Sequence, residues 1–147
     1  MAIGIMLVLL IVFIGFLPVL YIGGAFSPRV TPSVAQRDYN KYENEFNIVA
    51  KYISDNEIED FYINKEEFES FSTSDTEVYH AINTLIKAKY CTIGIEENTL
   101  YFQKYATLNC GKGIMYSLDG KQPYLQFLID AKNLSEENWY YYEDNYN

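Results

Sequence analysis

The chain has 147 residues, and its 20 acidic and 11 basic side chains give a formal net charge of −9 at pH 7. An acidic chain without a stripe of Lys and Arg repels phosphate backbones, which argues against a nucleic-acid partner. Its 15 Tyr and nine Phe argue against disorder, because such side chains bury enough apolar surface to offset chain entropy.

Residues 2–26 form an apolar stretch without a charged side chain. As a helix, the stretch would extend about 37 Å and span a hydrocarbon core of about 30 Å with some tilt. Pro18 is tolerated in such a helix at the cost of a kink. We therefore expect residues 1–26 to be a transmembrane anchor. A cleaved secretory signal is the alternative, because Gly23 and Gly24 precede a possible cleavage site near Ala25.

The charges that flank the apolar stretch do not decide on which side of the membrane the C-terminal domain lies. Basic residues beside a membrane segment prefer the cytoplasm. Arg29, Arg37 and Lys41 follow the apolar stretch and favour a cytoplasmic domain, but acidic residues are interleaved with them. Both orientations of a single-pass membrane protein therefore remain possible.

Residues 27–33 contain two prolines, which predicts a short stiff linker ahead of a single α+β domain over residues 34–147. A capping box at Ser33 predicts an amphipathic helix that ends near Asp55. Its apolar stripe has the three-and-four spacing of a helix and comprises Tyr39, Tyr42, Phe46, Val49, Ala50 and Ile53. At this spacing, the stripe favours a face packed on the domain core.

The acidic segment 55–77 predicts solvated surface, with a short strand over residues 58–63 and a helical turn over residues 66–71. It lacks the alternating ligands and central Gly of a calcium loop. A second capping box, formed by Ser74 and Glu77, predicts a helix that ends near residue 89. The apolar stripe of this helix comprises Val78, Ala81, Ile82, Leu85 and Ile86. His80, the only histidine, falls off that stripe and is expected at the surface.

From residue 90 the apolar period changes from 3.6 to 2, which predicts a β-hairpin with Glu97 and Asn98 at its turn. This register places Ile95 opposite Leu100, Ile93 opposite Phe102, and Cys91 on the same apolar face. Further along, we expect a loop over residues 108–113, a strand over 114–117, an Asp-Gly turn at 119–120, an apolar segment over 124–129 and a closing strand over 139–142. The predicted fold class is α+β, with two amphipathic helices and an antiparallel sheet of three to five strands.

The two cysteines carry the one covalent prediction. If the domain is exported, a Cys91–Cys110 disulfide closing a loop of about 20 residues would contribute roughly 3 kcal/mol. Two cysteines and one histidine do not supply a zinc site, and no neighbour in the sequence activates either thiol. We therefore expect a non-enzyme without catalytic, cofactor-binding or metal-binding residues.

Residues 113–123 read Gly-Ile-Met-Tyr-Ser-Leu-Asp-Gly-Lys-Gln-Pro and are followed by Trp-Tyr-Tyr-Tyr at 139–142. This pattern resembles the C-terminal signature of small uncharacterised bacterial proteins with an N-terminal membrane anchor. The resemblance implies a strand, a turn and an aromatic closing strand, and it brings no known activity or catalytic residue.

The leading hypothesis is a single-pass membrane-anchored, non-enzymatic interaction or ligand-binding module. The alternative is an exported soluble domain, cleaved near Ala25, that binds a glycan or another small ligand. In either case Tyr116, Trp139, Tyr140 and Tyr142 are the candidate ligand-binding aromatic residues. A Cys- or carboxylate-dependent hydrolase is a third, disfavoured hypothesis.

Overall fold

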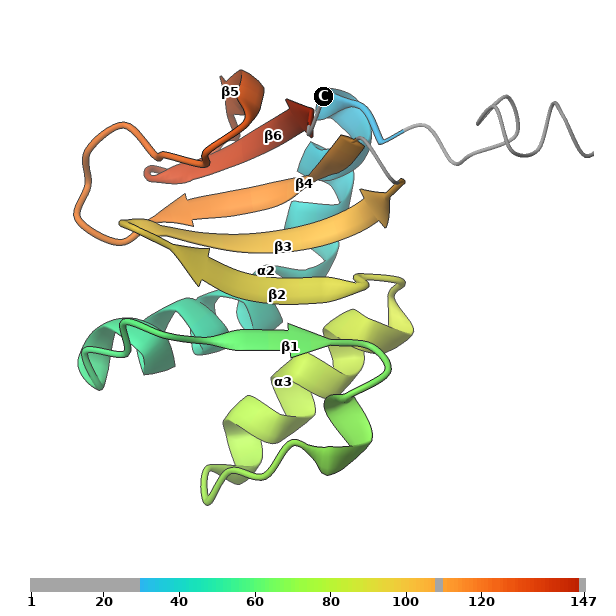
Figure 1. Cartoon of the computed structure of the whole chain (residues 1–147), viewed down its shortest axis with the longest axis vertical. Helices are drawn as coiled ribbons and strands as arrows, with labels where there is room; N and C mark the ends of the chain where they lie inside the picture. The colour runs from blue at the N-terminus through green and yellow to red at the C-terminus, as the bar shows by residue number, and fades with distance from the viewer. Residues whose placement is uncertain (1–29, 108–109, 146–147) are drawn as a thin grey trace, which may run out of the picture.

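A computed structural model of the chain describes residues 30–107 and 110–145 (Figure 1). The expected membrane anchor over residues 1–26, and residues 27–29 of the expected linker, lie outside the described residues. Within the described ranges, no helix combines the length and apolar character needed to cross a bilayer. The α+β class and the two amphipathic helices are confirmed, whereas the antiparallel sheet has six strands in place of three to five.

Helix α2 spans Pro32–Asp55 and begins before the capping box that the sequence predicts at Ser33. Thr31 is the N-cap, and its hydroxyl accepts a hydrogen bond from the backbone N–H of Val34. Proline fits the first turn of a helix because its missing N–H has no partner to lose there. The last two residues of the predicted linker therefore belong to the helix.

Helix α3 spans Thr76–Lys87 and is capped by Asp75, one residue after the predicted cap at Ser74. The Asp75 carboxylate accepts hydrogen bonds from the N–H groups of Glu77 and Val78 at 3.0 and 3.1 Å. A carboxylate at this end also complements the helix dipole, which explains why it displaces the serine as the cap.

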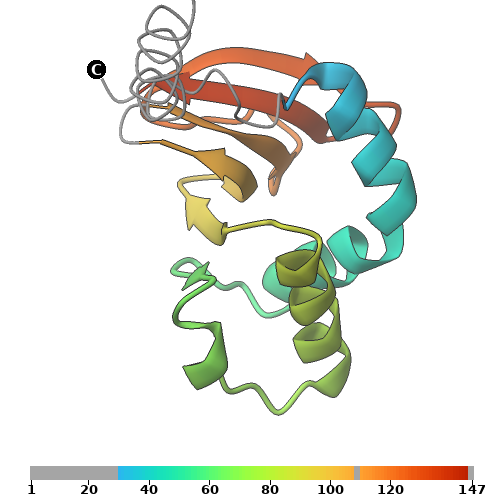
Figure 2. The same ribbon diagram turned by 90° about the vertical axis from the view of Figure 1, so that its right-hand side faces the viewer.

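Both helices pack their apolar stripes against one face of the sheet (Figure 2). Phe46 lies at the centre of this core, with its ring centroid 4.9 Å from Phe102, 5.4 Å from Tyr90 and 5.7 Å from Trp139. The predicted stripes are confirmed except at Tyr42, which is half-buried at a kink in α2. The buried stripe residues are Tyr39, Phe46, Val49, Ala50, Ile53, Val78, Ala81, Ile82, Leu85 and Ile86.

The strands follow the order β1-β2-β3-β4-β6-β5, and every neighbouring pair is antiparallel. Their bounds are Tyr62–Asn64 for β1, Thr92–Glu96 for β2, Thr99–Ala106 for β3, Cys110–Ser117 for β4, Leu128–Asn133 for β5 and Trp139–Asn145 for β6. The predicted strand over 58–63 is thus shorter and later, and the predicted helical turn is a 3₁₀ helix, η1, at Phe68–Ser70. The edge strands are β1 and β5.

The β2–β3 hairpin has the predicted register, with Ile95 opposite Leu100 and Ile93 opposite Phe102. Cys91 precedes β2 and is half-buried, and its N–H donates to the Gln103 carbonyl at 2.7 Å. The alternation of apolar residues sufficed here because one face of the hairpin is buried against the helices.

The predicted loop over residues 108–113 is wrong from Cys110 onward, because β4 begins there and includes Gly111 and Gly113. A Cβ atom at Gly113 would lie 2.0 Å from the carbonyl oxygen of Phe102, and one at Gly111 would lie 2.2 Å from Nε2 of Gln103. Gly113 therefore permits close approach of the β3 backbone, Gly111 makes room for a neighbouring side chain, and neither glycine interrupts the strand.

The segment after β4 also differs from the prediction. Gly120 has φ +73°, as expected at the Asp-Gly turn, but the apolar segment 124–129 is a strand only from Leu128, and β6 continues to Asn145. On the sheet face opposite the helices, Leu125 packs against Met115 and Tyr142. This small cluster fixes the β4–β5 connection to the sheet.

Candidate functional site

The four aromatic residues expected to bind a ligand do not form one surface. Trp139 is 3% exposed on the helix face of the sheet, where the ring centroid of half-buried Tyr116 lies 4.7 Å from it. Tyr142 is 0% exposed and belongs with half-buried Tyr140 to the cluster on the opposite face. Their burial assigns them to packing, which counts against a glycan groove lined by these rings.

Both cysteines are free. The Cys91 thiol donates to the Gln103 carbonyl at 3.3 Å, and Cys110 pairs with Asn145 at the start of β4. Burial raises the pKa of both thiols above the usual cysteine range. The protonated thiol is a poor nucleophile, so neither residue is activated for catalysis.

A cleft of about 490 Å³ lies where three segments that are distant in sequence meet: the C-terminal end of α2, the β2–β3 turn and the start of the β4–β5 connection. Ligand sites in proteins typically occupy about 300–1,000 Å³. The residues that line the cleft are Ile53, Ser54, Glu57, Ile58, Glu59, Glu97, Asn98, Leu118 and Asp119. None of the predicted site residues is among them.

The apolar floor of the cleft follows from the way α2 ends. The N–H of Glu57 donates to the Ser54 carbonyl at 3.2 Å, and the N–H of Ile58 donates to the Ile53 carbonyl at 3.1 Å. This Schellman motif requires a left-handed residue, which is Glu57 with φ 49°, and it brings Ile58 back against Ile53. Ile53 is buried, while Ile58 and Leu118 are half-buried. Together the three side chains form the floor.

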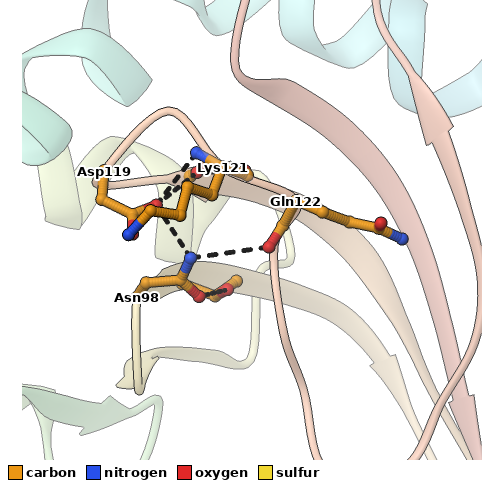
Figure 3. Close-up of polar contacts among 6 residues, drawn as sticks. Asn98, Asp119, Lys121 and Gln122 are labelled. Carbon is orange, nitrogen blue, oxygen red and sulfur yellow. Dashed lines mark hydrogen bonds and ion pairs between the residues drawn. The ribbon is translucent and has the colours of Figure 1, made fainter.

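The opposite wall is held by a polar network around Asp119 (Figure 3). Asn98 Nδ2 donates to Asp119 Oδ1 at 2.9 Å, the backbone N–H of Lys121 donates to the same oxygen at 3.0 Å, and Lys121 Nζ lies 2.9 Å from Oδ2. The Leu118 N–H donates to the Asn98 carbonyl at 2.8 Å. These bonds tie the β2–β3 turn to the β4–β5 connection.

The same network fixes the charge of this wall. Hydrogen bonds from the Lys121 side chain and backbone, together with the Asn98 amide, hold the pKa of the Asp119 carboxyl well below its usual range. The Asp119 carboxylate in turn raises the pKa of Lys121. Asp119 therefore stays ionised at physiological pH and acts as a fixed hydrogen-bond acceptor.

Three further carboxylates, those of Glu57, Glu59 and Glu97, lie at the rim and are exposed. In the part of the chain that the structure describes, no side-chain hydrogen bond or ion pair engages them. Glu97 has φ 50° at the first position of the β2–β3 turn. Since Lys121 balances Asp119, the cleft carries three uncompensated negative charges beside an apolar floor.

A second cleft, of about 470 Å³, is lined by residues of both α2 and α3. His80 is exposed at its rim, as the sequence predicts, and Glu45 and Glu77 also line it. Among the described residues, no group of three His, Cys, Asp or Glu side chains is placed to hold a metal ion. The cleft at the end of α2 is the stronger candidate, because a polar network fixes its wall and uncompensated charges surround its floor.

The sequence patterns do not predict this site. The composition of residues 55–77 predicts solvated acidic surface for Glu57 and Glu59, and the Asp-Gly pair predicts only a turn at Asp119. The one local signal is Asn56-Glu57-Ile58 after an amphipathic helix, since a chain that leaves a helix through a left-handed residue returns an apolar side chain to its last turn. No known protein family, curated protein or solved structure matches the chain.

Proposed function

We propose that this chain is a single-pass membrane-anchored, non-enzymatic module that binds a partner or ligand in the cleft at the end of α2. The observation that carries the proposal is the combination of an apolar floor, formed by Ile53, Ile58 and Leu118, with a fixed polar wall at Asn98 and Asp119. Apolar area supplies affinity, and a few placed polar groups supply orientation.

The chemistry of the cleft supports binding over catalysis. Its wall carboxylate, Asp119, is held ionised and so cannot donate a proton as a general acid. Among the described residues, neither thiol lines the cleft, and the pKa values of both thiols are raised. The charge-free stretch over residues 2–26 supports the membrane anchor.

The anchor is tested by washing membranes that contain the full chain. Intact protein that begins at Met1 is expected to stay with the membrane in high salt and at alkaline pH, because an apolar helix is held by the hydrocarbon core. Recovery of a mature chain that starts near Phe26 would contradict the anchor.

The cleft is tested by site-specific photo-crosslinking of the full chain in its own membrane. Benzoylphenylalanine in place of Ser54, which is exposed and lines the cleft, is expected to give one discrete adduct. The matched control is the same substitution at Ser72, which is exposed outside the cleft. Leu118→Ala, which removes part of the floor, is expected to weaken the adduct. Identical adducts from both serine positions, or none from Ser54, would refute the proposal.

A further inference from the structure

We infer that the occupant of the cleft is a segment of a partner protein in which a Lys or Arg side chain lies next to an apolar one. This inference rests on the proposed function, because it specifies the ligand of the same site. It follows from two properties that occur together: uncompensated negative charge at the rim of the cleft and an apolar floor beside it.

The charge around the cleft selects a cationic ligand. Residues 55–77 carry nine acidic side chains against the single basic residue Lys65, a balance of −8, and Glu57 and Glu59 belong to this segment. A surface of one sign attracts ligands of the opposite sign and repels those of its own. Phosphate-bearing ligands, including anionic lipid headgroups, are therefore disfavoured as occupants.

The chain itself shows the contact that such a ligand would make. The Lys121 ammonium lies 2.9 Å from Asp119, although the Lys121 side chain is 79% exposed. Glu57, Glu59 and Glu97 offer the same acceptor chemistry, and no described side chain occupies them. A cation from a partner gains attraction there without first displacing an internal ion pair.

The floor and the layout of the charges select a peptide segment over a bare cation. A bare metal ion would leave the apolar surface of Ile58 and Leu118 uncovered, so we expect an apolar side chain to accompany the charge. Glu57 and Glu59 come from the α2 side of the cleft, whereas Glu97 comes from the β2–β3 turn. A segment that alternates apolar and basic side chains contacts both walls and the floor.

The test uses the full chain in nanodiscs of the neutral lipid phosphatidylcholine and a fluorescein-labelled peptide, acetyl-Leu-Arg-Leu-Arg-Leu-amide. The control peptide carries citrulline in place of both arginines, which keeps the shape and removes the charge. Fluorescence anisotropy is expected to show at least tenfold tighter binding of the arginine peptide. Its affinity should fall as the salt concentration rises, because rim charges are screened.

Variants then locate the contact. Glu57→Gln and Glu97→Gln are each expected to weaken binding of the arginine peptide by about threefold to fivefold, the upper part of the range of an exposed ion pair. The matched controls Glu66→Gln and Glu69→Gln remove the same charge from the same acidic surface outside the cleft lining, and their affinities should change by less than twofold.

Each other outcome overturns the inference. Equal binding of the two peptides would show that the charge of the ligand plays no part. Equal losses of affinity in the cleft variants and the control variants would show only a general attraction to an acidic surface. If the arginine peptide does not bind at millimolar concentration, a basic and apolar peptide segment is not the ligand of the cleft. The proposed function is decided separately by the Ser54 and Ser72 crosslinks, which do not depend on the charge of the ligand.

Discussion

Replacing Glu57 with Gly is expected to stabilise the fold and weaken binding in the cleft at the same time. Glu57 follows α2 in the left-handed conformation with φ 49°, and Lys89 follows α3 in the same way with φ 76°. Both helices end in Schellman motifs, since Ile58 and Tyr90 each donate an N–H to the carbonyl five residues earlier at 3.1 Å. The two positions therefore have the same backbone geometry, but only Glu57 lines the cleft.

The magnitude follows from this geometry. A left-handed conformation costs an L-residue roughly 1–2 kcal/mol and costs glycine almost nothing. The stabilisation from replacing Glu57 with glycine is reduced by about 0.5–1 kcal/mol, because glycine loses more conformational freedom on folding. The net gain for Glu57→Gly is about 1 kcal/mol, which corresponds to a rise in Tm of about 4 °C for a domain of this size.

The assay is thermal unfolding of the full chain in neutral detergent, followed by near-ultraviolet circular dichroism, with peptide affinity measured on the same samples. Lys89→Gly is the control, with the same expected rise in Tm and an unchanged affinity. A fall in Tm for Glu57→Gly would refute the backbone argument. Equal affinities for the two variants would refute the role of the Glu57 carboxylate.

Three further outcomes test the core, the sheet and the pH dependence. Lys104→Met should cost about 3 kcal/mol in urea unfolding, because it leaves the buried Asp38 carboxylate with only the 3.8 Å contact to the exposed Arg37 side chain; Asp38→Asn in the same chain should restore part of this loss. Gly113→Ala should cost about 3 kcal/mol or more, since its Cβ would lie 2.0 Å from a backbone oxygen of β3. Burial raises the pKa of Tyr101 to about 12, so the folded state binds more protons than the unfolded state above pH 10. The free energy of unfolding should therefore fall between pH 10 and 12, and less steeply in Tyr101→Phe.

The elements that the sequence predicts correctly are those whose large apolar side chains gather on one face. The stripes of α2 and α3 and the register of the β2–β3 hairpin repeat with the period of their structure, because each element contacts the core on one side. The strand β5 has no such signal. It lies at the sheet edge, a register shift interrupts its pairing near Asp130, and Ile129 is 61% exposed. Its sequence therefore does not alternate cleanly.

The misassigned glycines have a different physical reason. The misassigned glycines are Gly111 and Gly113. They are strand residues, as is Gly94, which the predicted hairpin places correctly, although glycine is usually depleted in strands. At Gly94 a Cβ would lie 2.6 Å from the hydroxyl of Tyr101, so the missing side chain makes room for a neighbouring ring. Sequence alone does not separate a glycine that turns the chain from one that admits a neighbour, because the difference lies in the facing strand.

Left-handed backbone alone does not mark the binding site. Among the described residues, Glu57, Lys89, Glu97 and Asn138 are the non-glycine residues with positive φ, and two of these four lie outside the cleft. Lys89 adopts the same unfavourable left-handed conformation as Glu57 at the end of a helix, although it lies outside the cleft. The reversal of the chain after the helix is therefore enough to explain this conformation. What distinguishes Glu57 and Glu97 is that each places an unengaged carboxylate beside the same apolar floor. The site is therefore defined by the convergence of three distant segments, which no local pattern in the sequence records.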